Sequence, residues 1–333
     1  MPYSLLFRRA LNVIRRDPAL LVLGFILALL GGGSGGGGGG NLNFSFASGG
    51  DGNGGQMPSP DLLGQVDPLM VIAIVSIIFI VIIALILLFT FLQSVAQSGL
   101  VYGVDEVDRG TDVHWKELWR VGFSARGRQL FRLRLMLIFA VFAVVLAILV
   151  PIFVFATITG AAISSGAEPG VFAGLSIATL LVLVIPFSIS MLVVAVSWVL
   201  GLVVNLAVRD VVLNGTGTIE SIKAGWRLFR DNVVATVVTS LGLLLLSLLW
   251  VVPVFAVVVV AVVSVALIVF GLGATTGGFT PLIVGLIVIG GLGAWLLLAA
   301  VISPLVTYAE TVWTLLWRHL RGDRPLENEL ISA

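Results

Sequence analysis

Residues 71–89 read VIAIVSIIFIVIIALILLF, a run without a single charged side chain. At a rise of 1.5 Å per residue, a helix of this length spans about 28 Å, which matches the hydrocarbon core of a bilayer. Helix is the expected conformation because lipid offers no hydrogen-bond partner to an open backbone. This run therefore predicts an all-α integral membrane protein.

The rest of the chain has the same character, since 59% of its 333 residues are hydrophobic and 11% are charged. A soluble domain carries about 25% charged residues. The chain has no cysteine and two histidines, and His114 and His319 both lie beside basic segments rather than within apolar ones. A haem ligand would need a histidine between the spans, and no metal-binding or catalytic motif occurs. We therefore expect no metal, no cofactor and no enzymatic activity.

Apolar blocks predict six transmembrane helices, arranged as three tandem hairpins. The blocks cover residues 18–33, 69–100, 130–162, 171–208, 233–273 and 281–316. The second and third hairpins are too long, because each of their legs would measure about 57–63 Å. Tilting cannot absorb this length, so these helices either project beyond the outer face of the membrane or break.

Prolines inside the long hairpins bear on that choice. Four prolines lie there: Pro151, Pro186, Pro253 and Pro304. We favour the interpretation that they are ordinary kinks of membrane helices. The alternative is that they mark discontinuous helices that frame a transport site. An alternative has eight spans, with hidden turns near Pro253 and Pro304.

The basic residues predict the orientation. We assign all 18 Lys and Arg residues to the segments before the first block and after the sixth or to the two connections that follow the second and fourth blocks, counting Arg132 and Arg134 with the connection that leads into the third block. The remaining connections hold acids only. By the positive-inside rule, both termini lie in the cytoplasm, at the plasma (inner) membrane of a prokaryote. A cleaved signal peptide is the weaker alternative, because no A-x-A site follows the first block.

The chain is expected to form one membrane domain over residues 1–333. Residues 31–68 are rich in glycine, with six consecutive glycines from Gly35 to Gly40, and predict a flexible outer loop. Residues 323–333 are expected to form a cytoplasmic tail.

A basic amphipathic segment precedes each predicted hairpin. In the first segment Leu6, Ala10 and Val13 share one helical face, and arginines occupy the other. Such helices lie flat at the membrane surface, where basic side chains reach anionic headgroups of the cytoplasmic leaflet. The predicted headgroup contacts are Arg8, Arg9, Arg15, Arg16, Lys116, Arg120, Arg128, Lys223, Arg227 and Arg230.

These segments and the glycines Gly110, Gly215 and Gly322, which follow the second, fourth and sixth blocks, suggest an internal repeat. The predicted units are residues 1–110, 111–215 and 216–322, each an amphipathic helix, two spans and a glycine turn. The alternative is chance matching between apolar segments of low complexity.

Five polar residues at the inner ends of the blocks form a candidate cluster. Gln93 and Gln97 lie four apart in the second block, Asn205 and Arg209 four apart in the fourth, and Glu310 in the sixth. A carboxylate within a span is a functional-site hypothesis, and Arg209 is its natural partner. The alternative is a structural ion pair, or a carboxylate that reaches cytoplasmic water.

Two stretches carry a family resemblance. The first is residues 97–132, which include Asp105-Glu106-Val107-Asp108-Arg109-Gly110, and the second comprises residues 208–213 with residues 221–230. Here the chain resembles the six-span prokaryotic membrane families that are similar to the membrane domain attached to some glycerophosphodiester phosphodiesterases. The chain has no room for the soluble phosphodiesterase barrel, so the resemblance implies a membrane fold without that activity.

The sequence thus predicts a non-enzymatic scaffold, lipid-associated factor or subunit of a larger membrane assembly. Its expected partners are membrane lipids and other membrane subunits, and not nucleic acid. The alternative is a transporter or permeation protein, with the polar cluster lining a cavity that faces the cytoplasm.

Overall fold

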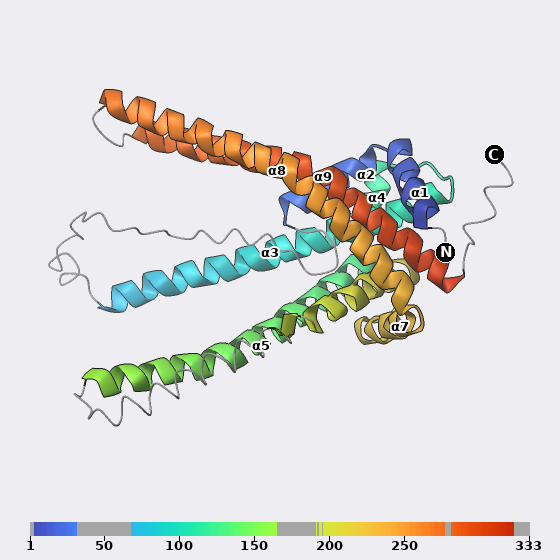
Figure 1. Cartoon of the computed structure of the whole chain (residues 1–333), viewed down its shortest axis with the longest axis horizontal. Helices are drawn as coiled ribbons and strands as arrows, with labels where there is room; N and C mark the ends of the chain where they lie inside the picture. The colour runs from blue at the N-terminus through green and yellow to red at the C-terminus, as the bar shows by residue number, and fades with distance from the viewer. Residues whose placement is uncertain are drawn as a thin grey trace.

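The computed structural model describes residues 3–31, 68–164, 191, 193–194, 196–276 and 281–322, and the regular elements of these ranges are all helical (Figure 1). In chain order they are α1 (Tyr3–Arg16), α2 (Ala19–Leu29), α3 (Pro68–Asp108), α4 (Trp115–Gly122), α5 (Ala125–Ser164), η2 (Asp210–Asn214), α7 (Thr218–Asp231), α8 (Val233–Thr276) and α9 (Pro281–Arg321). The π-helix η2 ends a longer helix, Val196–Asn214. The all-α prediction is confirmed; Pro186, residues 32–67 of the predicted loop and the tail 323–333 lie outside the described residues.

Four helices are far longer than one membrane crossing requires. α3, α5, α8 and α9 contain 41, 40, 44 and 41 residues, which corresponds to about 60–66 Å each. α8 and α9 continue through Pro253 and Pro304 without interruption. The eight-span alternative, which places turns at these two prolines, is therefore wrong.

Within the described residues, five helices are long and apolar enough to cross a membrane: Ile72–Asp108, Ala125–Ala147, Val196–Asn214, Val233–Gly271 and Ile283–Arg321. The described part of the chain is thus all-helical, and its long apolar helices are those of a membrane protein. The predicted first span is α2, whose 11 residues measure about 17 Å and fall short of the hydrocarbon core. α2 is short because Asp17 Oδ1 accepts a hydrogen bond from Ala19 N at 2.8 Å at its start, and Gly31 has a positive φ just after its end.

One end of the helix bundle is closely packed, and we call it the base. It consists of α1, α2, α4, α7 and the adjacent ends of the long helices, residues 90–108, 125–134, 201–214, 233–243 and 298–321. Trp313 of α9 lies at its centre without solvent exposure, in the same apolar cluster as Leu6 of α1 and Leu206. α2 buries Leu20, Leu23, Gly24 and Leu27 between α9 and α3.

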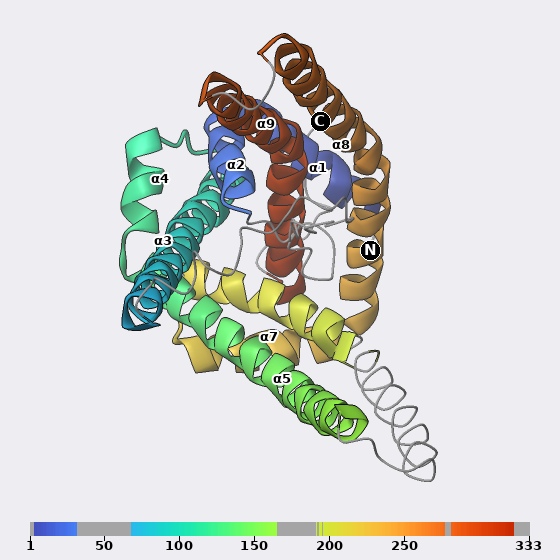
Figure 2. The same cartoon turned by 90° about the vertical axis from the view of Figure 1, so that its left-hand side faces the viewer.

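The remaining lengths of α3, α5, α8 and α9 extend from the base toward one side, and we call them the arms (Figures 1 and 2). The arms of α8 and α9 lie together as a pair, whereas those of α3 and α5 stand apart from it and from each other. Each residue from Ile72 to Phe89 of α3 is exposed. Apolar side chains on every side of a helix are stable only in an apolar surrounding, so this length of α3 fits a bilayer.

Two helices of the base, α2 and α9, approach each other closely at Gly24. A Cβ atom at this position would overlap Thr307 Oγ1 and would lie 3.2 Å from the carbonyl oxygen of Ser303 on α9. Next to this contact, Ser303 Oγ donates a hydrogen bond to the carbonyl oxygen of Leu21 at 2.9 Å. Glycine therefore lets α2 pack against α9, and even a methyl group would force the two helices apart.

We expect Gly24→Ala to lower the unfolding free energy of the detergent-solubilised protein by about 1–3 kcal/mol, because it overpacks the α2–α9 contact. Thermal denaturation followed by circular dichroism measures this loss. Gly285→Ala is the matched control, since a Cβ atom at Gly285 would meet no neighbouring atom within 4 Å and alanine favours helix by about 1 kcal/mol. Equal melting temperatures for the two variants would contradict the close packing at Gly24.

Candidate functional site

Four of the five predicted polar residues meet inside the base. Arg209 donates a short hydrogen bond through Nη2 to Glu310 Oε2, and these two side chains have no exposed surface. Arg209 Nη1 also donates to the backbone carbonyl of Asn205, at 2.7 Å. Gln97 Nε2 donates to the other carboxylate oxygen of Glu310, at 2.9 Å. Gln93, one turn before Gln97 on α3, forms no hydrogen bond with these four among the described residues.

Arg134 of α5 extends this group, which we call the buried cluster. Its Nη2 donates to Gln97 Oε1 at 2.6 Å, so the amide of Gln97 accepts from Arg134 and donates to Glu310. Side chains of α5, α3, α9 and the Val196–Asn214 helix are thereby linked in one series. Buried charges are tolerated when they are paired and hydrogen-bonded, and each ion of the cluster donates or accepts a hydrogen bond within this series.

Arg134 is absent from the predicted polar cluster because it was counted among the basic residues that set orientation. A signal was present, since Arg134 follows Leu130 and Leu133 and thus lies inside the predicted third block, which begins at about residue 130. A charged residue inside a predicted span is itself a functional-site hypothesis.

A second set of ion pairs, the rim network, joins α1, α3 and α9 where α3 and α9 end. Arg318 Nη1 lies 2.9 Å from Asp108 Oδ2 and 3.0 Å from Asp105 Oδ1. Arg9 Nε lies 2.7 Å from Asp108 Oδ1, and Arg109 Nη2 lies 2.7 Å from Asp105 Oδ2. Both aspartates are buried and three helices supply their partners, so the network fixes α1 against the ends of α3 and α9.

Nine of the ten predicted headgroup residues are exposed, and one, Arg9, is not. Arg9 is half-buried and binds Asp108, so it differs from the expectation of a lipid contact. The other nine are exposed: Arg8, Arg15, Arg16, Lys116, Arg120, Arg128, Lys223, Arg227 and Arg230. They are distributed over α1, α4, α7 and the start of α5, on the outside of the base.

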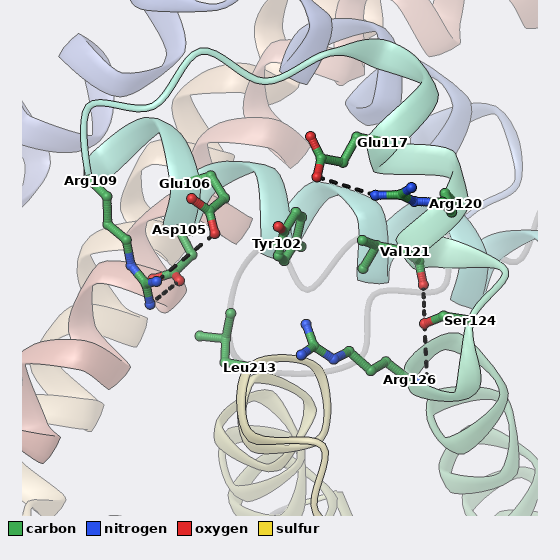
Figure 3. A pocket seen from close by; sticks show the side chains of 10 residues that line it. All are labelled: Tyr102, Asp105, Glu106, Arg109, Glu117, Arg120, Val121, Ser124, Arg126 and Leu213. Atoms are coloured by element: carbon green, nitrogen blue, oxygen red, sulfur yellow. Dashed lines mark hydrogen bonds and ion pairs between the residues drawn. The ribbon is translucent and has the colours of Figure 1, made fainter.

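The base also contains a cavity of about 480 Å³, which lies apart from the residues of the buried cluster (Figure 3). It is bounded by the end of α3, by α4, by the start of α5 and by Leu213 of η2. Its lining residues are Tyr102, Asp105, Glu106, Arg109, Glu117, Arg120, Val121, Ser124, Arg126 and Leu213. Three carboxylates and three guanidinium groups thus surround one cavity, which we call the mixed-charge pocket.

The two sites differ in the chemistry that they permit. In the buried cluster Arg209 is bound to Glu310, and Gln97 links Arg134 to Glu310, so the cluster holds helices together. The mixed-charge pocket is open and can accept a charged group. Among the described residues, no group of three or more His, Cys, Asp and Glu side chains could hold a metal ion.

The chain belongs to a family of unknown function, DUF7544, whose model matches residues 16–317. No curated protein and no solved structure matches the chain. The family match covers the arms and the base except for residues 3–15 of α1 and the last residues of α9, and it assigns no activity to either part.

We expect Glu310→Gln to reduce the unfolding free energy by about 3–5 kcal/mol, because Arg209 would be left as an unpaired buried charge. Denaturation in mixed detergent micelles, followed by circular dichroism, measures the change. The double variant Arg209→Met/Glu310→Met should lose less unfolding free energy than the sum of the losses in Arg209→Met and Glu310→Met, since it removes both charges. Glu220→Gln on the exposed face of α7 is the control. Additive losses would show that the pair is not coupled.

We expect Asp108→Asn to release α1, because Arg9 loses its ion pair with Asp108 and Arg318 keeps only its ion pair with Asp105. A hydrogen bond to a charged group contributes about 1.5–3 kcal/mol, so backbone amides of α1 should exchange hydrogen at least about tenfold faster. Hydrogen exchange with mass spectrometry measures this rate. Asp112→Asn, at an exposed position of the same connection, should leave α1 unchanged. Unaltered exchange in Asp108→Asn would mean that apolar packing alone holds α1.

Proposed function

We propose that this chain is a non-enzymatic scaffold subunit of a larger assembly in the inner membrane of a prokaryote. The observation that carries the proposal is the length of exposed apolar surface on α8. Val234, Val252 and Phe270 are 73%, 68% and 77% exposed, and their spacing of 18 residues places them on one helical face, about 27 Å apart in succession.

We call this exposed apolar face of α8 the stripe, and it is too long to be covered by the hydrocarbon core of the membrane alone. It measures about 54 Å from Val234 to Phe270, whereas the hydrocarbon core is about 30 Å thick. Even a tilt of about 40°, the upper end for membrane helices, leaves a span of about 41 Å across the membrane. One end of the stripe must therefore lie outside the hydrocarbon, and apolar surface of this extent favours a protein partner.

We further propose that the base lies at the cytoplasmic side. Three observations support this orientation: α3, the Val196–Asn214 helix and α9 end in the base, α5 and α8 begin there, and the exposed basic residues cover its outside. The positive-inside rule favours such an arrangement. It agrees with a hairpin of α8 and α9 that leaves the cytoplasmic face and returns to it.

The proposed tandem units gain support from their terminal glycines. Gly110, Gly215 and Gly322 have φ angles of 84°, 68° and 78°, and they follow α3, η2 and α9. Glycine is favoured in this left-handed conformation, which ends a helix and releases the chain. A shared stop signal at corresponding points fits three related units of helix, hairpin and glycine turn.

Lipid contact is the second part of the proposed role. On α4 and α7, exposed aromatic residues stand beside exposed basic ones, as Trp115 beside Lys116 and Trp226 beside Arg227. This combination suits a helix that lies in the interface, with rings in the lipid and cations near phosphate. We propose that these surfaces seat the base on the cytoplasmic leaflet.

The transport alternative receives no such support. It requires a water-filled route to Glu310, and the side chains of Arg209 and Glu310 have no exposed surface. The mixed-charge pocket is lined by Asp105 and Glu106, and none of its described lining residues belongs to the buried cluster.

We expect a photo-crosslinking amino acid at the position of Val234 or Phe270 to join the chain to one discrete membrane protein in native membranes. The same photo-crosslinking amino acid at the position of Val252, midway along the stripe, identifies whether lipid or protein surrounds the middle of α8. Lys223, exposed on α7, is the control position and should give no such product. Lipid adducts alone at all three α8 positions, together with a monomer after purification in mild detergent, would overturn the subunit proposal.

A further inference from the structure

The mixed-charge pocket has a charge pattern that neither the buried cluster nor the rim network requires. Its three carboxylates and three guanidinium groups sum to zero formal charge, yet they are not fully paired. Arg109 is committed to Asp105, with N and O atoms 2.7 Å apart. The remaining groups are Arg120, Arg126, Glu106 and Glu117, and these have loose ionic partners or none.

Arg126 is the cation that the pocket leaves available. Its guanidinium forms no ion pair with a carboxylate of the described chain, and its nearest aromatic contact is the ring of Tyr102, with 5.9 Å between Cζ and the ring centroid. Figure 3 shows the Arg126 side chain reaching into the pocket from the start of α5. A guanidinium with free N–H groups suits a phosphate, which it can bind through two parallel hydrogen bonds.

Glu106 and Glu117 are the anions that the pocket leaves available. Glu106 lies 3.9 Å from Arg109 and Glu117 lies 3.6 Å from Arg120, measured between N and O atoms. Both separations exceed the 2.7–3.2 Å of a hydrogen bond, so the carboxylates keep capacity to accept. They come from different elements, α3 and α4, and in Figure 3 they stand around Tyr102 on the side of the pocket away from Arg126.

The helix α4, which bounds the pocket, also carries aromatic side chains typical of a membrane interface. Trp115, Trp119 and Phe123 form a ladder along α4, with successive ring centroids 5.6 and 5.8 Å apart. Phe123 in turn contacts Phe91, at 6.0 Å, where the exposed part of α3 ends and the base begins. Tryptophan and phenylalanine collect at the level of lipid headgroups, so a ligand of the pocket can have its polar part here and its apolar part along α3.

We propose that the mixed-charge pocket binds a phosphoethanolamine group, with its phosphate on Arg126 and its primary ammonium between Glu106 and Glu117. A primary ammonium donates three hydrogen bonds, which two carboxylates can accept, whereas a quaternary ammonium would call for several aromatic rings. Tyr102 is the one aromatic residue that lines the pocket. The volume of about 480 Å³ is within the range of small-ligand sites, about 300–1,000 Å³. The inference does not depend on the proposed partner subunit.

The test uses the purified full chain in detergent and native mass spectrometry, with phosphatidylethanolamine, phosphatidylcholine and phosphatidylglycerol as probes. We expect phosphatidylethanolamine to bind at least tenfold more tightly than the other two. Arg126→Gln should weaken the binding of phosphatidylethanolamine at least tenfold, because it removes the phosphate contact. Glu106→Gln/Glu117→Gln should bring the ethanolamine lipid to the level of the choline lipid. Equal binding of all three lipids by the unaltered chain would overturn the proposal, as would tightest binding of phosphatidylglycerol.

Arg132→Gln is the matched control, because Arg132 is exposed on the same helix and does not line the pocket. It should retain the lipid preference and the melting temperature of the unaltered chain. Loss of affinity for phosphatidylethanolamine in Arg132→Gln equal to that in Arg126→Gln would overturn the assignment to the pocket. Soluble phosphoethanolamine distinguishes the source of the group: competition at micromolar concentration indicates a free metabolite, and its failure at millimolar concentration indicates the lipid.

Discussion

The burial of Arg209 against Glu310 is the constraint on which the base depends. Neither side chain has exposed surface, so each must find its opposite charge and its hydrogen bonds within the protein. A guanidinium or carboxylate that is buried without a partner costs several kcal/mol, and more in the absence of water. The pair can form only when α9 and the Val196–Asn214 helix have the correct rotation and depth. Gln97 and Arg134 extend the same requirement to α3 and α5. Four helices that share apolar, interchangeable surfaces are thereby fixed in one register.

The position of its polar residues also explains how α3 can lie partly in lipid and partly in the protein interior. α3 has apolar, exposed residues up to Phe89 and then Ser94, Gln97 and Asp105 in its buried part. The first part can rest in lipid, where lipid chains supply the apolar surround. The second part is stable only against other helices that carry complementary polar groups. The length of α3, about 60 Å, is thus the sum of two parts. One part is an arm that fits the membrane, and the other is packed in the base.

The sequence predicted the helical membrane class, the apolar blocks and the partner of Glu310, because these depend on composition and on charge. Hydrophobic length alone did not reveal that α2 ends after 11 residues or that α3, α8 and α9 each continue into the base. Those outcomes depend on tertiary contacts, such as Gly24 against Thr307, which no single segment encodes. Arg9 was assigned to lipid for the same reason, since its helical face fits a headgroup contact and only the fold brings Asp108 to it. The pocket was missed because Glu106, Glu117 and Arg126 lie on three elements and follow no spacing pattern.

The distribution of partners among the acidic residues explains why one cavity can hold a ligand without loosening the base. Asp105 lines the mixed-charge pocket, but it is already bound to Arg318 and Arg109. A cationic ligand that took Asp105 would have to compete with the contact between α3 and α9. Glu106 and Glu117 have no such structural duty, because their arginine neighbours lie 3.9 and 3.6 Å away. The acids that stabilise the fold are therefore distinct from the acids that can accept a ligand, and occupation of the pocket by an ammonium group adds hydrogen bonds without removing any that the base requires.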